Sequence, residues 1–187
     1  MIEIRWHGRG GQGVVTAAKV LAAAALSQGK HIQAFPEFGP ERRGAPIQAF
    51  TRISEGPIRL FSHVTSPGIV VVLDRTLVGK IPFTDGLTRD GTAVVNCRHS
   101  AKELREEIKL DYGTVYSVDA TAIANETMGR PITNTPMLGA LLRATGILEV
   151  DVVEEELRSL FGAKLSPKML QANIDALQRA YKEVRNE

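Results

Sequence analysis

The chain has 187 residues, of which 43% are hydrophobic and 24% are charged, values close to the average of globular proteins. Its net charge of +2 is too small for the basic surface of a nucleic-acid-binding protein, so we expect no nucleic-acid partner. The single cysteine, Cys97, excludes an internal disulfide bond and any metal or iron–sulfur site built from cysteines of this chain alone. No signal peptide and no apolar run of membrane-spanning length is visible, so we expect a cytoplasmic protein that does not bind membranes.

The first part of the chain predicts a strand, a loop and a helix. Apolar and polar residues alternate over residues 2–7, the pattern of a strand with one buried face. The stretch GRGGQG follows at 8–13, and an alanine-rich segment then predicts a helix over 14–27, closed by Gly29.

Further strands are predicted in the middle of the chain. Residues 46–53 and 57–61 are expected to form a hairpin, with Ser54-Glu55-Gly56 as its turn. The β-branched run IVVVL at 69–73 is typical of a strand buried on both faces of a parallel sheet. The remaining expected elements are strands at 32–35, 93–96 and 115–118 and a helix at 102–108.

Three helices are predicted in the C-terminal part from their start and stop signals. The signals are Thr135-Pro136 with Gly146 for the first, a capping-box-like Asp151 and Glu154 with Gly162 for the second, and Ser166-Pro167 for the third. The order of elements favours an α/β fold: a Rossmann-like, mainly parallel or mixed sheet flanked by helices, with a helical C-terminal part. We expect residues 1–187 to form a single domain, with the helices from about residue 134 packed on it.

The glycine-rich loop fits the pattern G-x-G-x-x-G at Gly8, Gly10 and Gly13, between a strand and a helix, where a dinucleotide-binding loop belongs. A P-loop is excluded, because Val14 and Val15 stand where it needs Lys and Ser or Thr. The acidic residue that binds an NAD ribose at the end of the second strand is also missing, since Ala34-Phe35 stand there, with Glu37 beyond Pro36.

Two interpretations of the glycine loop remain open. The glycines allow close packing of strand and helix, or they let the backbone approach an anion at the start of the helix. The amide of Gln12 favours ligand contact, because this side chain has no obvious packing role. The candidate cofactor-binding residues of the loop are therefore Gly8, Gly10, Gly11, Gln12 and Gly13.

A second loop, FPEFGPERRGAP at 35–46, places charges on a backbone restricted by proline. Glu41, Arg42 and Arg43 are its candidate cofactor-binding residues, because a guanidinium on a stiff loop can grip phosphate or carboxylate through two hydrogen bonds. An ion pair within the loop is the alternative, and it would contribute little stability. Both loops are expected at the carboxyl ends of strands, where α/β proteins bind ligands, and this favours a functional role.

The sequence has no nucleophile elbow, no metal-ligand cluster and no evident acid–base pair. Cys97 and His99 are close together, but their spacing is explained by chance. We therefore expect no catalytic residue and no metal ligand in this chain.

Three stretches together resemble one family: HGRGGQGVVTAAKVLAAAA from His7, FGPERRGAPIQAFTRI from Phe38, and GRPITNTPMLGALLRATG from Gly129. They are similar, in order and over nearly the whole chain, to the gamma subunit of pyruvate and 2-ketoisovalerate:ferredoxin oxidoreductases, the 2-oxoacid:acceptor oxidoreductase gamma family. The form Glu-Arg-Arg-Gly-Ala-Pro is that of the pyruvate/ketoisovalerate branch; the 2-ketoglutarate branch tends to carry Glu-Ala-Arg-Gly-Gly.

The resemblance implies a multi-subunit, pyruvate synthase-type enzyme of anaerobic metabolism. Such an enzyme decarboxylates a 2-oxoacid on thiamine diphosphate, passes electrons through iron–sulfur clusters to ferredoxin, and transfers the acyl group to coenzyme A. Thiamine lies between alpha and beta subunits, and the delta subunit holds clusters. The gamma chain would be an accessory subunit that binds no cofactor alone and helps shape the coenzyme A region.

Two other classes of function stay open at this point. A stand-alone dinucleotide-binding module would use the loop at 8–13 for a nicotinamide or flavin cofactor. A pure scaffold subunit would use both loops only for contacts with sister subunits.

Overall fold

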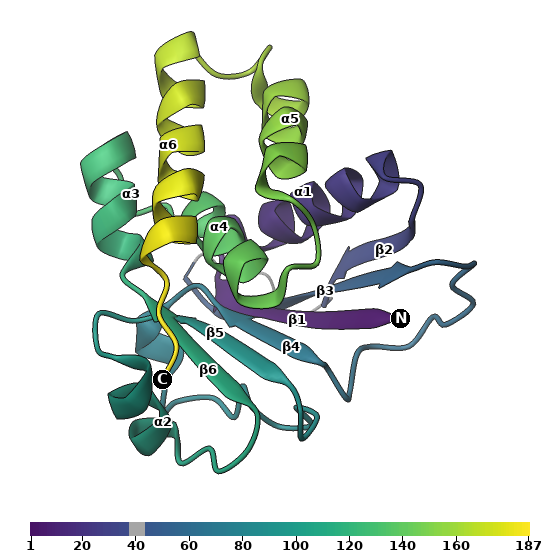
Figure 1. Cartoon of the computed structure of the whole chain (residues 1–187), viewed down its shortest axis with the longest axis vertical. Helices are drawn as coiled ribbons and strands as arrows, with labels where there is room; N and C mark the ends of the chain where they lie inside the picture. Colours follow the sequence, from purple (N-terminus) through teal and green to yellow (C-terminus); the bar gives the residue numbers. More distant parts are fainter. Residues whose placement is uncertain (38–43) are drawn as a thin grey trace.

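The computed structural model describes residues 1–37 and 44–187, which form a six-stranded sheet with helices on both faces (Figure 1). The strands lie in the order β2-β3-β1-β4-β5-β6. In chain order the elements are β1 (Ile2–Arg9), α1 (Val14–Ser27), β2 (His31–Pro36), β3 (Pro46–Ser54), β4 (Ile69–Val72), the short 3-10 helix η1 (Arg75–Leu77), β5 (Thr92–Asn96), α2 (Ala101–Ile108), β6 (Thr114–Val118), α3 (Ala120–Met128), α4 (Asn134–Thr145), α5 (Val150–Phe161) and α6 (Pro167–Glu183).

The sheet is mixed, as predicted for this α/β fold. β1, β4, β5 and β6 are mutually parallel, whereas β3 pairs antiparallel with both β1 and β2. The carboxyl ends of the four parallel strands therefore meet along one side of the sheet, here called the carboxyl edge. The antiparallel β3 begins at this same edge, because Arg9 at the end of β1 pairs with Pro46.

The predicted hairpin of residues 46–53 and 57–61 is wrong in its second strand. β3 forms, but residues 57–61 have no regular structure, and β3 instead pairs with β2. Both edges of β3 are occupied, by β1 and β2, so no backbone groups of β3 remain free to pair with the segment that follows it. Pro57 also lacks a donor N–H at the point where the second strand would begin.

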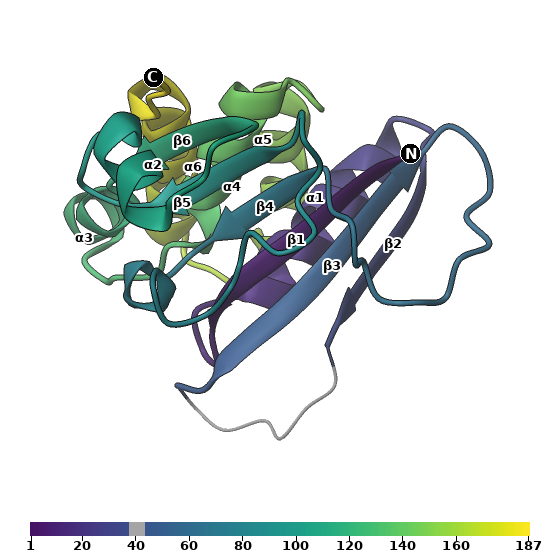
Figure 2. The ribbon, with the colours of Figure 1, turned by 90° about the horizontal axis from the view of Figure 1, so that it is seen from below.

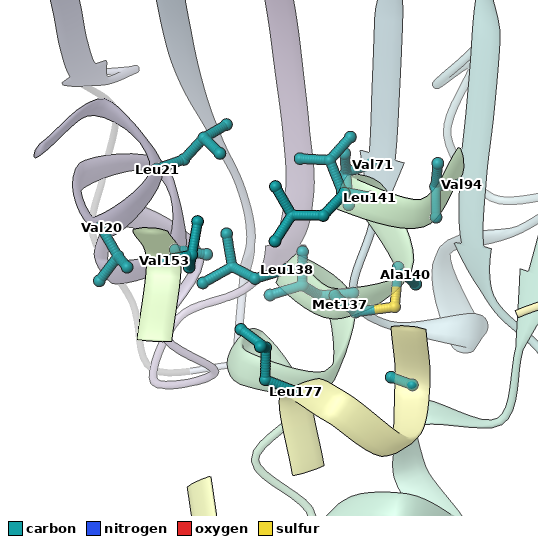
Figure 3. Close-up of a cluster of buried hydrophobic side chains, with 14 of the residues drawn as sticks. Val20, Leu21, Val71, Val94, Met137, Leu138, Ala140, Leu141, Val153 and Leu177 are labelled. Atoms are coloured by element: carbon teal, nitrogen blue, oxygen red, sulfur yellow. The ribbon is translucent and has the colours of Figure 1, made fainter. Parts of the chain in front are cut away.

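Alternating side chains of the parallel strands divide the core into two clusters. Val71 of β4 faces the larger cluster, whereas Val70 and Val72 face the smaller one, as the period of two in a strand requires. The larger cluster lies between the sheet and helices α1, α3, α4, α5 and α6 (Figure 3). The smaller cluster lies on the opposite face, beneath α2 and the segment that follows η1 (Figure 2). Burial on both faces explains why β4 reads as one continuous apolar run.

Helix α4 is the centre of the helical layer. Every residue from Thr135 to Leu142 is buried, because the helix contacts β5 and β6 on one side and α6 on the other. Gly139 is the point of closest approach to α6: a Cβ built there would lie 2.0 Å from the carbonyl oxygen of Leu177. The outer helix α6 contacts α3, α4 and α5, so the C-terminal helices pack on the sheet through α4.

Most predicted helix boundaries are confirmed, with three differences. α4 begins at Asn134, two residues before the predicted first helical residue Pro136, and the side chain of its N-cap residue Thr133 bonds the carbonyl oxygen of Leu73 instead of capping the helix. α5 has no side-chain cap, so the capping box predicted from Asp151 is wrong. Helix α3 was not predicted, although Asp119 caps it by accepting from the N–H of Ala122 at 2.9 Å.

The last residues of the chain return to the sheet. Arg185 and Ser117 of β6 exchange backbone hydrogen bonds of 2.9 and 3.0 Å, and Arg105 of α2 forms an ion pair with Glu187. This tail covers part of the outer side of β6. Within the described residues, no helix is both long and apolar enough to cross a lipid bilayer.

The close contact between α4 and α6 gives a first prediction. Gly139→Ala should lower the free energy of unfolding by about 1–3 kcal/mol or more, because the added methyl group meets backbone that cannot move alone. Urea unfolding of the two proteins measures this difference. Gly56→Ala is the matched control, since a Cβ there meets nothing within 4 Å and should change stability little. Equal stabilities of the two variants would contradict the packing argument.

Candidate functional site

The glycine loop at residues 8–13 joins β1 to α1 at the carboxyl edge of the sheet. Two of its glycines have a packing role. A Cβ at Gly8 would lie 2.5 Å from Cγ2 of Val14, and Gly13, with φ of 78°, would bring a Cβ to 2.6 Å from Nδ2 of Asn134. Gly11 differs, because a Cβ there meets nothing within 4 Å and the residue is exposed. Close packing therefore explains Gly8 and Gly13, while the backbone at Gly11 is open to an approaching molecule.

Gln12 has a structural role that its sequence position did not reveal. Its Oε1 accepts from the backbone N–H of Arg9 at 2.7 Å, and its Nε2 donates to Oδ2 of Asp74 at 2.6 Å. Both ends of the amide are thus used inside the protein, so any ligand contact of Gln12 must share these groups. The side chain holds the loop after β1 against the end of β4.

Asp74 is the anchor of this contact. Its Oδ1 accepts from the backbone N–H of Thr76 at 2.8 Å and from the Thr76 hydroxyl at 2.7 Å, and the Arg9 guanidinium lies 3.2 Å from Oδ2. Partial burial alone would raise the pKa of Asp74, but the hydrogen bonds from Thr76 and Gln12 and the charge of Arg9 together hold this pKa below its usual value. The carboxylate is therefore charged at neutral pH and fixes the loop electrostatically.

The second predicted loop meets the glycine loop at its C-terminal flank. Glu41, Arg42 and Arg43 lie outside the described residues. The residues that follow, Gly44 and Ala45, contact the glycine loop. The N–H of Gly10 donates to the carbonyl oxygen of Ala45 at 3.0 Å, and the N–H of Gly44 donates to the carbonyl oxygen of Gly10 at 3.3 Å. The two loops, predicted separately from sequence, are therefore joined through their backbones.

The third motif, at the start of α4, reaches the same place. The carbonyl oxygen of Leu73, at the end of β4, accepts from Thr133 Oγ1 at 3.1 Å and from Asn96 Nδ2 at 2.8 Å. Asn134 lies against Gly13, and its Oδ1 is buried without a hydrogen-bond partner among the described residues. An acceptor left in this state is completed by water or by a ligand N–H or O–H.

The start of α1 is suited to anions. No side chain caps it, and its first turn carries no acidic residue. The free N–H groups of such a helix start, together with its dipole, favour a negative charge. Asn134 beside Gly13 and the open backbone at Gly11 flank this point. The arrangement can hold a phosphate or carboxylate through backbone groups.

A buried pair, Arg5 and His7, lies under the loop on the opposite face of the sheet from α1. Arg5 Nε donates to His7 Nε2 at 3.2 Å, and its Nη2 donates to the carbonyl oxygens of both Phe83 and Asp85. Burial, and then the Arg5 charge, lower the pKa of His7 to about 3. His7 is therefore neutral at physiological pH and accepts from Arg5, which in turn bonds the segment at Phe83 and Asp85.

The sheet order argues against nicotinamide binding in the usual way. In dinucleotide-binding folds, the acidic residue that binds the ribose stands at the end of β2, next to β1. In this protein β3 separates β2 from β1. Glu37, just after β2, is thereby two strand spacings away, about 10 Å, from β1. Its Oε1 lies 3.9 Å from His63 Nδ1 instead. Among residues 1–37 and 44–187, no three His, Cys, Asp or Glu side chains are grouped as metal ligands.

Fold and site together define an α/β domain that presents an anion-suited backbone loop at the carboxyl edge of its sheet. The chain belongs to the family described as pyruvate ferredoxin/flavodoxin oxidoreductase, whose model matches residues 3–183. It is 49% identical to the pyruvate/ketoisovalerate oxidoreductases common subunit gamma of Pyrococcus abyssi, over 96% of this chain and 97% of the relative. The family predicted from the three motifs is thus confirmed.

Solved structures agree with this assignment. The crystal structure of the pyruvate oxidoreductase subunit PORC of Thermotoga maritima matches with a TM-score of 0.87 and 42% identity, over 100% of this chain and 98% of that one. The 2-oxoglutarate:ferredoxin oxidoreductase of Magnetococcus marinus, solved with 2-oxoglutarate, coenzyme A and succinyl-CoA, shares the fold alone, with 21% identity and a TM-score of 0.78. The match covers 97% of this chain and 30% of the chain of that protein.

Sequence reasoning missed the residues that position the loop. They are Arg9, Asp74, Asn96, Thr133 and Asn134. Asp74 carried a usable signal, because it directly follows a predicted buried parallel strand, the place where α/β proteins put site residues. Nothing in the local sequence indicates that Asn134 meets Gly13.

Removal of the Asp74 carboxylate should loosen the glycine loop. Asp74→Ala leaves Gln12 and Arg9 without their shared acceptor, so we expect hydrogen exchange at the Gly10 and Gln12 amides to accelerate about tenfold or more. Exchange measured residue by residue by NMR tests this. Asp111→Ala, an exposed carboxylate elsewhere, is the control and should leave those amides unchanged. Unchanged exchange in Asp74→Ala would show that the loop does not depend on this anchor.

The buried His7 predicts a pH dependence of stability. The unfolded chain takes up a proton on this residue near its ordinary pKa of 6.5, whereas the folded protein does so only near about 3. Stability is therefore lost as pH falls through this interval, by up to about 1.4 kcal/mol per pH unit from this group. Urea unfolding at several pH values should show a shallower acid-side slope for His7→Gln than for wild type. His31→Gln, at an exposed position, should keep the wild-type slope; a parallel profile for His7→Gln would refute the assignment.

Proposed function

We propose that this chain is the gamma subunit of a cytoplasmic, multi-subunit pyruvate- or 2-ketoisovalerate:ferredoxin oxidoreductase. Its partners are the alpha, beta and delta subunits, with ferredoxin as electron acceptor of the assembly. The assembled enzyme oxidatively decarboxylates the 2-oxoacid to acyl-CoA. The gamma chain contributes positioned backbone and positive charge at the coenzyme A region, together with contacts between subunits, and it has no activity alone.

One observation supports the accessory role: the described parts of three motifs meet at the carboxyl edge of the sheet. Gly10 bonds Ala45, and Asn134 packs on Gly13, so the glycine loop, residues 44–45 that follow the charged loop, and the start of α4 lie together. The polar side chain at the loop tip, Gln12, already donates a hydrogen bond to Asp74. The described part of this surface offers the free N–H groups at the start of α1.

Coenzyme A fits these groups chemically. When bound, it supplies the thiol that accepts the acyl group, and its phosphates need donors and positive charge. The uncapped start of α1 and the backbone at Gly11 would serve as donors, and Arg42 and Arg43 as charges. Asn134 Oδ1 would accept from a ligand N–H or O–H. Iron–sulfur clusters do not fit this chain, whose only cysteine is the buried Cys97. These clusters and thiamine diphosphate are assigned to the sister subunits.

The choice of 2-oxoacid is assigned to other subunits. The Pyrococcus abyssi relative is named a common subunit of pyruvate and ketoisovalerate oxidoreductases, so in that organism one gamma chain serves both substrates. A shared subunit cannot set the difference between the two acids. Residues 41–46 here have the form of this branch.

The proposal is tested in the reconstituted complex with Arg42→Ala and Arg43→Ala, singly and together. Loss of a charged contact to phosphate should raise the KM for coenzyme A about tenfold while assembly and the KM for pyruvate stay constant. Arg89→Ala, an exposed arginine at the opposite edge of the sheet, is the matched control.

Three other results would change the assignment. Variants that assemble poorly, yet use coenzyme A normally once assembled, would support a scaffold role. Unchanged assembly and unchanged KM would exclude both roles for this loop. Micromolar binding of NAD(P) or flavin to the full chain alone, measured by calorimetry, would favour a stand-alone dinucleotide module.

A further inference from the structure

A pocket lies along the carboxyl edge, and no residue of the glycine loop lines it. It is formed by the three loops that follow β4, β5 and β6, and its volume is about 460 Å³. The lining residues are Arg75, Asn96, Cys97, Arg98, His99, Asp119 and Thr121. Pockets of this size, at the ends of parallel strands, are the usual place and volume for a small metabolite.

Cationic side chains enter this pocket from two of the loops. Arg75 follows β4. Arg98 and His99 follow β5, and these two residues are exposed. Arg75 is partly neutralised by an ion pair with Glu107 of α2. Arg98 forms no ion pair with any residue that the structure describes, so its guanidinium has its fork of donors available.

The floor of the pocket is rigid and polar. Asn96 Nδ2 donates to the carbonyl oxygen of Leu73 at 2.8 Å and to Thr121 Oγ1 at 2.9 Å, while its Oδ1 accepts from the Thr121 N–H at 3.3 Å. These bonds fix the ends of β5 and α3 relative to β4. Beside them Asp119 holds a carboxylate that also caps α3. Carboxylate and hydroxyl oxygens at this position are acceptors for the hydroxyl groups of a ligand.

We propose that this pocket binds a phosphomonoester of a hydroxylated molecule, such as a nucleoside monophosphate or a sugar phosphate. The phosphate, which carries nearly two negative charges at neutral pH, contacts Arg98, Arg75 and His99. The hydroxyl groups contact Asp119 and Thr121. This site does not depend on the glycine loop or on the role proposed above for Arg42 and Arg43.

The test uses the full chain and four probes: inorganic phosphate, AMP, ribose 5-phosphate and adenosine. Calorimetry should detect AMP and ribose 5-phosphate but not adenosine, and Arg98→Ala should weaken the binding of both about tenfold or more. Arg89→Ala is again the charge-matched control and should bind as wild type does. In wild type, NMR signals of the His99 ring should shift with added phosphate, a readout that requires no variant.

The probes also distinguish the source of the phosphate. Tighter binding of AMP than of ribose 5-phosphate identifies a nucleotide, and equal binding identifies a sugar phosphate; either supports the site. The proposal is overturned if no phosphorylated probe binds, if adenosine binds as well as AMP, or if Arg98→Ala and Arg89→Ala behave alike. Arg42→Ala should leave phosphate binding here intact, so failure of the coenzyme A role and failure of this site are separate results.

Discussion

The end of β4 is the anchor for the described part of the carboxyl edge of this protein. The N–H of Leu73 donates to the carbonyl oxygen of His7 at 2.8 Å, and the carbonyl oxygen of Leu73 accepts from both Asn96 and Thr133. One residue further, Asp74 binds the side chain of Gln12. Each neutral bond of this kind contributes about 1 kcal/mol net and each charged one somewhat more, and burial raises the cost of breaking them. Four segments are thus held in register from one strand end.

Such anchoring preorganises the loop for contact with another molecule. A loop already held in its binding conformation loses little entropy when a ligand or a neighbouring subunit arrives, so more of the contact energy appears as affinity. The ionised Asp74 and the neutral His7 both serve this purpose, one by attracting donors and one by packing in a dry interior. Neither is placed to transfer a proton. Both illustrate that a shifted pKa near a site can result from a structural role of the residue as well as from a catalytic one.

The sequence predicted well those features that depend on neighbours along the chain. α1, the buried β4, the Ser166 cap of α6 and the glycine stop after α4 follow from local patterns, and all are found in the structure. The hairpin at 57–61 was wrong because the partners of β3 lie elsewhere in the sheet. The role of Gln12 was missed for the same reason, since its partner Asp74 is 62 residues away along the chain. Of the candidate site, the sequence predicted the glycine loop and its edge, but not the side chains that hold it.

The C-terminal tail makes the two outer strands of the sheet, β2 and β6, unequal. Arg185 occupies backbone groups on the outer side of β6, whereas no described strand pairs with the outer side of β2. A free strand edge is a template on which another chain can add its own strand, and an occupied edge is not. A strand added at β6 would have to displace the tail at Ser117, whereas β2 offers an outer side with no described strand on it, so the chain favours one direction for growth of its sheet.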